Sequence, residues 1–365
     1  METVTKVSEN FIGNPSSLHK LGEHAGRLLD QSRIQVAELL GVEKNEIFFT
    51  SGGTEGDNWV IKGTAIEKIP YGKHLITTSV EHPAVKESFI QLEKLGFDVT
   101  YLPVNEEGVV SAEDVRTAIT DETILVSVMS VNNEIGSVQP IEEIGHVLEN
   151  YPAIHFHVDA VQGIGRVPLT LGKDSRIDFA VFSAHKFHGP KGVGIVYKKH
   201  GRVLAPILSG GGQESGLRSG TENVAGIAGT AKALRLQLEN TEEKNKHLYE
   251  LKERLLAILH KHEKITIFTP SQGAPQIICF GIRGIKGEVV VHGLESEGIF
   301  VSTTSACSSR KGLTSSTLFA MNIPERIAET SVRISLSPNN TIEEVEKFER
   351  VLDKLYGQFE RLNTR

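Results

Sequence analysis

Three residues whose side chains can take part in chemistry lie at or just after the ends of apolar runs in this sequence. They are Lys186 after DFAVFSA, Asp159 within IHFHVDA and His82 soon after HLITT. Such runs predict buried strands, and open α/β sheets bind ligands at the carboxyl ends of their strands. A lysine amine can attack a carbonyl, a carboxylate can pair with the ring nitrogen of pyridoxal phosphate, and an imidazole can stack on a flat cofactor and move protons. We therefore expect the three side chains at one edge of a sheet.

A cradle for a phosphate group is predicted by SGGTEG at residues 51–56. Gly52 and Gly53 permit a tight turn between a strand and a helix, and Thr54 offers a hydroxyl. The amides at the start of the following helix suit an anion. Ser183 and His185, next to the lysine, are further candidate phosphate donors.

Each of these residues also has an ordinary structural interpretation. Lys186 could be a surface lysine, Asp159 a helix cap and His82 a turn residue. His155 and His157 alternate along one strand, which leaves a mononuclear metal site as an alternative. Two ligands two residues apart are weak evidence, so we predict that the site holds no metal.

The composition restricts the classes of protein. The chain has 365 residues, 39% of them hydrophobic, and a formal net charge of −7. A mildly acidic chain with scattered lysines argues against nucleic acid or an anionic membrane as its partner. No apolar run approaches the roughly 20 residues that span a bilayer, and nothing resembles a signal peptide. We expect a cytoplasmic protein.

The pattern of elements predicts an α/β fold with two domains. Single cores stop growing at roughly 250 to 300 residues, so we place a large domain at 1–240 and a smaller α/β domain at 241–365. In the first two-thirds, β-rich runs spaced for helical crossovers predict a mostly parallel sheet with helices on both faces. These runs are 46–50, 74–78, 123–131, 154–160, 178–184 and 193–199.

Helical periodicity begins near Asn223 and extends for some forty residues, where Leu248, Leu251, Leu255 and Ile258 fall on one helix face. The second domain then contains the strand-like QIICFGI and SVRISLS and a final helix. Thr341 and Glu344 predict a capping box at the start of that helix, and its apolar face is Ile342, Val345, Phe348, Leu352 and Leu355.

The two cysteines lie in different settings. Cys279 lies in the apolar run QIICFGI, which indicates a buried structural thiol, whereas Cys307 lies in the polar stretch STTSACSSRKG, which indicates an exposed one. Two cysteines cannot form a disulfide framework.

Eight blocks of the sequence together resemble a known family. They are FIGNPSSLHKLG, TSGGTEGDN, EHPAV, VNNEIGSVQPI, HVDAVQGIG, FSAHKFHGPKGVG, GGGQESGLRSGTEN and VSTTSACSS. In order and spacing they are similar to the pyridoxal-phosphate-dependent cysteine desulfurases of the NifS and IscS type, and the resemblance covers essentially the whole chain. It implies a homodimeric fold-type I transferase that converts L-cysteine to L-alanine. It also implies a persulfide whose sulfur passes to an iron-sulfur scaffold or a tRNA thiouridylase.

The resemblance implies a role for each matching residue. Lys186 would be the Schiff-base lysine, Asp159 the partner of the ring nitrogen and His82 the stacking imidazole. Arg333 would grip the substrate carboxylate, and Cys307 would accept the sulfur as the attacking thiolate. The remaining implied contacts are Gly53, Thr54, Ser183 and His185 to the phosphate, Asn132 and Gln162 to the cofactor or substrate, and Thr221 to the phosphate of the neighbouring subunit.

The sequence departs from the family at two places. The family opens with a segment similar to YLDNAATT, whereas this sequence begins METVTKVSEN, and Thr304 stands where many relatives have glycine. A β-branched residue restricts the backbone at that position. The different start leaves one alternative to a desulfurase, an N-terminally shortened, catalytically impaired chain that acts as a binding partner. A second alternative is a relative similar to selenocysteine lyases.

Overall fold

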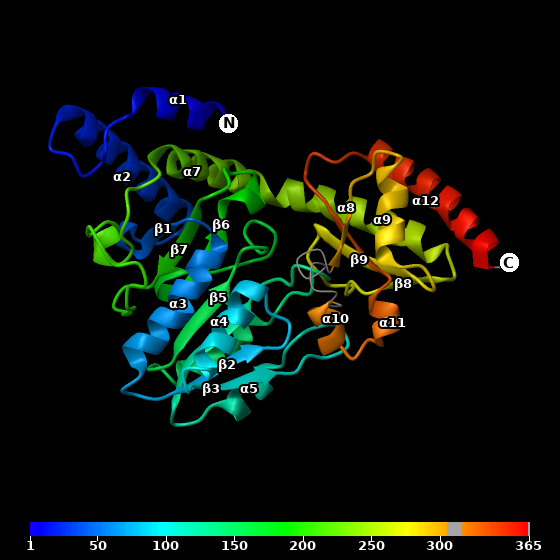
Figure 1. Cartoon of the computed structure of the whole chain (residues 1–365), viewed down its shortest axis with the longest axis horizontal. Helices are drawn as coiled ribbons and strands as arrows, with labels where there is room; N and C mark the ends of the chain where they lie inside the picture. Colours follow the sequence, from blue (N-terminus) through cyan, green and yellow to red (C-terminus); the bar gives the residue numbers. More distant parts are fainter. Residues whose placement is uncertain (305–314, 364–365) are drawn as a thin grey trace. The chain divides into compact units, whose positions relative to one another are not determined.

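The computed structural model describes residues 1–304 and 315–363, and the chain divides into two compact units (Figure 1). Unit 1 contains Met1–Leu102, Ser111–Ser130 and Gln139–Glu239. Unit 2 contains Pro103–Val110, Val131–Val138 and the chain from Asn240 onward.

Unit 1 is built on a seven-stranded sheet with the order β1-β7-β6-β5-β4-β2-β3. Only β7 is antiparallel to its neighbours, so the predicted mostly parallel sheet is confirmed. The strands are β1 (Ile47–Thr50), β2 (His74–Thr78), β3 (Asp98–Leu102), β4 (Thr123–Met129), β5 (His155–Asp159), β6 (Phe179–Ser183) and β7 (Gly194–Lys198).

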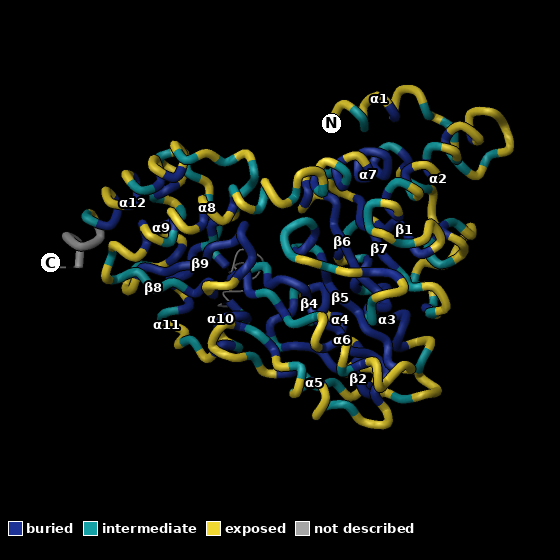
Figure 2. The backbone as a smooth tube through the Cα atoms, turned by 180° about the vertical axis from the view of Figure 1, so that it is seen from behind, coloured by how far each residue is buried: buried dark blue, intermediate teal, exposed yellow. Residues whose placement is uncertain are grey.

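Helices flank this sheet. They are α1 (Glu2–Asn10), α2 (Lys20–Leu40), α3 (Gly53–Lys68), α4 (Pro83–Glu93), α5 (Ala112–Ala118), α6 (Ile141–Glu149) and α7 (Val224–Leu238), with short 3-10 turns η1 (Lys44–Glu46), η2 (Gly172–Asp174), η3 (Ala184–Phe187) and η4 (Glu214–Gly216). Helix α3 packs over β4, β5, β6 and β7. The central strands are nearly all buried, as their dark blue tubes in Figure 2 show. Burial on two faces explains why these strands read as continuous apolar runs.

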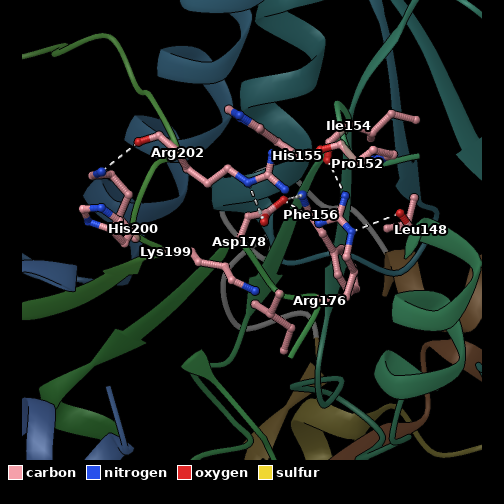
Figure 3. A network of polar contacts seen from close by, with 12 residues as sticks. Leu148, Pro152, Ile154, His155, Phe156, Arg176, Asp178, Lys199, His200 and Arg202 are labelled. Carbon is pink, nitrogen blue, oxygen red and sulfur yellow. Dashed lines mark hydrogen bonds and ion pairs between the residues drawn. The ribbon is translucent and has the colours of Figure 1, made fainter. Parts of the chain in front are cut away.

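A polar network anchors the start of β5, the strand that ends at Asp159 (Figure 3). The buried Asp178 carboxylate lies 2.7 Å from Arg176 Nη1 and 2.7 Å from Arg202 Nε, and it also accepts a hydrogen bond from the Phe156 N–H. The two arginines donate in turn to backbone carbonyls of the last turn of α6 and of the loop before β5, those of Leu148, Tyr151, Pro152 and Ile154. The network therefore fixes where β5 begins.

Unit 2 has a four-stranded antiparallel sheet with the order β10-β11-β9-β8. The strands are β8 (Ile265–Ile267), β9 (Ile277–Ile282), β10 (Ser302–Thr303) and β11 (Ser331–Ser335), and the helices are α8 (Thr241–His260), α9 (Gly287–Glu295), α10 (Ser316–Ala320), α11 (Glu325–Ala328) and α12 (Ile342–Asn363). Its core joins α8, α9 and α12 to β9 and β11. Cys279 of β9 is completely buried, as predicted, in a separate cluster with Ile135, Phe268 and Leu318.

The helical predictions for this part of the chain are mostly confirmed. Leu248, Leu251, Leu255 and Ile258 are buried on one face of α8. The capping box of α12 forms, since the Glu344 N–H donates to Thr341 Oγ1 and the Thr341 N–H donates to Glu344 Oε2. The helical stretch of some forty residues from Asn223 consists of two helices, α7 and α8, which are separated at Asn240, a residue in the left-handed region at φ 51°.

No helix of the described ranges combines the length and the apolar character that a membrane crossing needs.

Candidate active site

The carboxyl ends of six strands of unit 1 share one edge of the sheet, because only β7 runs the other way. Asp159 ends β5 and pairs in register with Val181 of β6, two residues before Ser183. Gly194 of β7 lies between Ser183 and Thr50, the last residue of β1. The predicted site residues at the ends of β1, β5 and β6 are therefore neighbours.

The turn from β1 into α3 is shaped for close approach. A Cβ atom at Gly53 would lie 2.9 Å from Val161 Cγ2 and 3.4 Å from Ser183 Cβ, so only glycine fits without a shift. Helix α3 has 16 residues and begins without a side-chain cap, since its N-cap residue is Gly52. The first amides of a helix have no partner within the helix. Together with the exposed Thr54, they form the predicted place for an anion.

Asp159 is a buried carboxyl, 5% exposed. Its Oδ1 accepts a hydrogen bond of 3.0 Å from the Val161 N–H. Burial raises the pKa of Asp159, while His82, the Val161 N–H and Lys186 act in the opposite direction. A buried carboxylate is stable only with a hydrogen-bonded or positively charged partner. The end of β5 is thus suited to hold a cation.

His82 caps the start of α4, because its Nδ1 accepts a hydrogen bond of 3.1 Å from the Ala84 N–H. Burial lowers the pKa of His82 and outweighs the opposite effect of Asp159, and Lys186 lowers it further. The imidazole is therefore neutral at physiological pH, and its one ring proton lies on Nε2.

Lys186 and His185 lie on η3, directly after β6, and both are exposed. Burial, followed by the charges of Lys186 and Lys191, lowers the pKa of His185. Gln162 is half-buried just beyond β5, and Thr221 is exposed before α7. The structure brings five predicted residues to one edge of unit 1, namely Gly53, His82, Asp159, Ser183 and Lys186; their individual roles stay predictions.

Asn132 belongs to unit 2, where its amide holds a turn. Its Oδ1 accepts hydrogen bonds from the N–H groups of Glu134 (2.9 Å) and Ile135 (3.0 Å), and its Nδ2 donates to Thr317 Oγ1 at 3.1 Å. The side chain is completely buried and its orientation is fixed from both ends.

Arg333 also belongs to unit 2 and lies on β11. Its Nη1 donates to the Asn133 carbonyl at 2.8 Å, whereas its Nε is buried and has no hydrogen-bond partner among the described residues. The open Nε suits a carboxylate, which takes two parallel hydrogen bonds from a guanidinium. Cys307 lies outside the described residues.

Two buried acids at the edge of unit 1 were not predicted from the sequence. Asp57 is 1% exposed and Glu81 is 3% exposed. Asp57 comes one helical turn after Gly53, and Glu81 directly precedes His82. A charged residue one turn beyond a glycine turn, or next to a strand-end histidine, is the signal that could have identified them. Within residues 1–304 and 315–363, no group of three or more His, Cys, Asp or Glu side chains is arranged to hold a metal ion.

Comparison with known proteins gives consistent matches. The family described as "Aminotransferase class-V" matches residues 1–348. A "NifS/IcsS protein homolog" of Lactobacillus delbrueckii subsp. bulgaricus is 52% identical, over 100% of this chain and 95% of the relative. A "Cysteine desulfurase IscS" of Clostridium botulinum is 47% identical, over 98% of this chain and 90% of the relative.

The fold also matches solved structures. A structure titled "NIFS-LIKE PROTEIN" superposes with a TM-score of 0.92 at 39% sequence identity, over 98% of this chain and 94% of that one. The predicted fold class is therefore confirmed at the level of the whole chain.

Proposed function

The chain belongs to the aminotransferase class-V family, and on that basis we propose that it is a cysteine desulfurase that uses pyridoxal 5'-phosphate to convert L-cysteine to L-alanine. The observation that carries the proposal is the grouping of Asp159, His82 and Lys186 beside the uncapped start of α3. Such a grouping is expected for a ligand that has an anionic group, a basic ring nitrogen and an electrophilic carbon.

The residues of unit 1 fit pyridoxal 5'-phosphate. The amides of the first turn of α3 and the side chains of Thr54, Ser183 and His185 would hold the phosphate. Asp159 would hold the ring nitrogen, since a buried carboxyl with raised pKa gains a cationic partner there. When bound, this cofactor supplies an aldehyde that joins to an amine and a ring that withdraws electrons from the adjacent carbon.

The other side chains would bind the substrate and move protons. Lys186 presents the amine at the end of β6, and His82 can carry a proton on Nε2 because its Nδ1 is taken by the Ala84 N–H. Arg333 would bind the substrate carboxylate through its open Nε. Asn132 and Gln162 would contact the cofactor or substrate, and Thr221 would contact the phosphate in a neighbouring subunit.

Cys307 would accept the sulfur. A bond forms between the Cys307 sulfur and the substrate sulfur, the substrate carbon–sulfur bond breaks, and its carbon keeps the electron pair and takes a proton. The net exchange converts L-cysteine and a thiol to L-alanine and a persulfide, which balances in atoms and electrons. We further propose a cytoplasmic homodimer that passes this sulfur to an iron-sulfur scaffold or a tRNA thiouridylase. Exposed apolar side chains between α1 and the first turn of α2, at Ile12, Leu18 and Leu21, support an interface between two copies.

The test is alanine release from L-cysteine by the full chain loaded with pyridoxal 5'-phosphate, with a reductant present. We expect turnover in the wild type and in Cys279→Ala, whose thiol is buried, and none in Cys307→Ala. Turnover that persists in Cys307→Ala would contradict the assigned sulfur acceptor. A wild type that binds the cofactor and releases no alanine would contradict the desulfurase activity.

A further inference from the structure

Asp57 is a buried carboxyl to which the proposed reaction assigns no role. It lies on α3, one turn after Gly53, and is 1% exposed. Its Oδ1 lies 3.4 Å from His157 Nε2, and neither atom has a hydrogen-bond partner among the described residues. Burying a polar atom without a hydrogen-bond partner costs free energy, so the arrangement of Asp57 and His157 needs a physical explanation.

His157 links Asp57 to a third buried side chain. The imidazole is completely buried, and its Nδ1 lies 2.8 Å from Ser127 Oγ. The three residues come from α3, β5 and β4, and form a chain from Asp57 through His157 to Ser127. His157 and Asp159 are two residues apart on β5, so they lie on the same face of the strand. The row of side chains from Asp57 through His157 to Ser127 therefore lies on the same face of β5 as Asp159.

Two proton arrangements are compatible with these distances. In the first, Asp57 is ionised and accepts from His157 Nε2–H, while the Ser127 hydroxyl donates to Nδ1. In the second, Asp57 is protonated and donates to Nε2, while Nδ1–H donates to Ser127 Oγ. The imidazole is neutral in both, and the two arrangements differ by one proton on Asp57.

The surroundings favour the second arrangement. Asp159 accepts a hydrogen bond from the Val161 N–H and interacts with His82 and Lys186, whereas Asp57 Oδ1 has no backbone N–H and no cationic side chain as a hydrogen-bond partner among the described residues. Two carboxyls in one buried site cannot both ionise readily. The charge therefore belongs on Asp159.

The electrostatics of the cluster agree with this assignment. Burial, reinforced by Asp159 and Glu81, raises the pKa of Asp57 well above its usual range, and burial lowers the pKa of His157 to about 3. The titratable groups that act on Asp57 from the elements packed around it are Asp159 at the end of β5 and Glu81 just before α4, and His157 on β5 faces its Oδ1.

We propose that Asp57 is a positioning residue that acts through Asp159: it keeps a proton, donates it to His157 Nε2, and so leaves Asp159 as the carboxyl that carries the charge for the ring nitrogen of the cofactor. This inference rests on the proposed function, because that function supplies the cofactor. It adds a residue that touches neither cofactor nor substrate. A neutral hydrogen-bond donor at position 57 is what the role requires.

The first experiment determines the tautomer of His157. The full chain, labelled with ¹⁵N-histidine, is studied by NMR with and without pyridoxal 5'-phosphate, and His157→Gln identifies its signals. We expect the proton on Nδ1 at neutral pH in both forms. A proton on Nε2 would mean an ionised Asp57 and would overturn the proposal, whether or not the enzyme is active.

The second experiment compares Asp57→Asn with Asp57→Ala in the cofactor-loaded chain. Asparagine keeps a neutral N–H donor toward Nε2, so the dissociation constant of pyridoxal 5'-phosphate should stay within about two-fold and the pH profile of its bound absorbance should not move. Alanine removes the donor, and we expect a loss of affinity of about ten-fold, or roughly 1.4 kcal/mol, together with a shifted profile. If asparagine fails as alanine does, Asp57 acts as an anion and the proposal is overturned.

A matched control is available on the same helix and strand. Thr64, seven residues after Asp57 on α3, places its Oγ1 3.1 Å from Nδ1 of the buried His155. Thr64→Val should leave the pH profile of the bound absorbance unchanged. If Thr64→Val shifts this profile as much as Asp57→Ala does, the effect of Asp57→Ala comes from altered packing in general, and the proposal is overturned. A wild type without cofactor absorbance would overturn the proposed function, whereas a cofactor-binding wild type with the Nε2–H tautomer would overturn this inference alone.

Discussion

The hydroxyl of Thr304 lies 2.6 Å from the hydroxyl of Ser331, and both side chains are buried. Ser331 begins β11, the strand that carries Arg333 two residues later. Thr304 is the residue at which the resemblance to the family leads to the expectation of glycine. The threonine therefore adds a buried hydrogen bond to the strand that carries Arg333, the arginine proposed to bind the substrate, within unit 2.

Replacement of Thr304 by valine should destabilise unit 2, because valine keeps the shape but leaves the Ser331 hydroxyl without a partner. A buried unsatisfied hydroxyl costs about 1–3 kcal/mol. Thr304→Ser keeps the hydroxyl and should lose less. Urea unfolding of both variants measures the difference, and equal losses would show that the hydrogen bond contributes nothing.

Asp178→Ala should be among the most destabilising single changes in unit 1. The carboxylate is completely buried between Arg176 and Arg202, and its removal leaves two partly buried guanidinium groups without their anion. Breaking one side of a buried ion pair costs about 3–5 kcal/mol. Urea unfolding is the measurement, with Glu250→Ala as the control.

Glu250 forms an ion pair of 3.1 Å with Arg254 on the exposed face of α8, so its loss should be much smaller. Similar losses for Asp178→Ala and Glu250→Ala would contradict the view that the network of Figure 3 anchors β5.

Glu81 should make stability fall as the pH rises. Burial raises its pKa to about 8, although Thr78 and the Met129 N–H act in the opposite direction. The pKa of Glu81 in the unfolded chain is about 4.3. At pH values between that pKa and the pKa in the folded chain, the folded chain holds a proton that the unfolded chain releases, so the free energy of unfolding decreases by about 1.4 kcal/mol per pH unit. Glu81→Gln removes this contribution.

Urea unfolding at pH 5 and pH 8 tests the effect. The decline between the two pH values should be smaller in Glu81→Gln than in the wild type, whereas the exposed Glu106→Gln should decline as the wild type does. The same decline in all three proteins would show that Glu81 is ionised in the folded chain.

The sheet of unit 1 was largely predictable, because buried parallel strands carry an unmistakable apolar pattern. The run HLITT coincides with β2, and the other runs match their strands within one or two residues. The boundaries of the helices were harder to predict from the sequence. Helix α3 begins at Gly53, within the stretch SGGTEG that was predicted to precede the helix, since the glycine turn itself enters the helix, and α2 has no counterpart in the predictions.

The polar interior was beyond sequence reasoning. The positions of Asp57 and Glu81 beside a glycine turn and a strand-end histidine give no measure of their burial, because that burial depends on how α3 and the end of β2 pack against β4 and β5. His157 was considered as a metal ligand, whereas its neighbours in the structure are a hydroxyl and a carboxyl. Tertiary packing decides such partners, and a single sequence does not record it.

Arg333→Lys should weaken the binding of L-cysteine more than it slows the turnover of bound substrate. Arg333 already donates from Nη1 to the Asn133 carbonyl, and Nε belongs to the edge of the guanidinium that binds a carboxylate through two hydrogen bonds. A lysine is a point charge and cannot replace that edge. We expect KM for L-cysteine to rise by about ten-fold or more, which corresponds to roughly 1.4 kcal/mol.

Cysteamine, which lacks the carboxylate, supplies the matched substrate control. Wild type should bind it as weakly as Arg333→Lys does, because Arg333 then has no carboxylate to hold. Arg254→Lys, an exposed arginine on α8, should leave both substrates unaffected. A variant that binds L-cysteine as tightly as the wild type would remove Arg333 from the substrate site. A variant that loses cysteamine binding to the same degree would show that the change acts through the fold of β11 and not through the carboxylate.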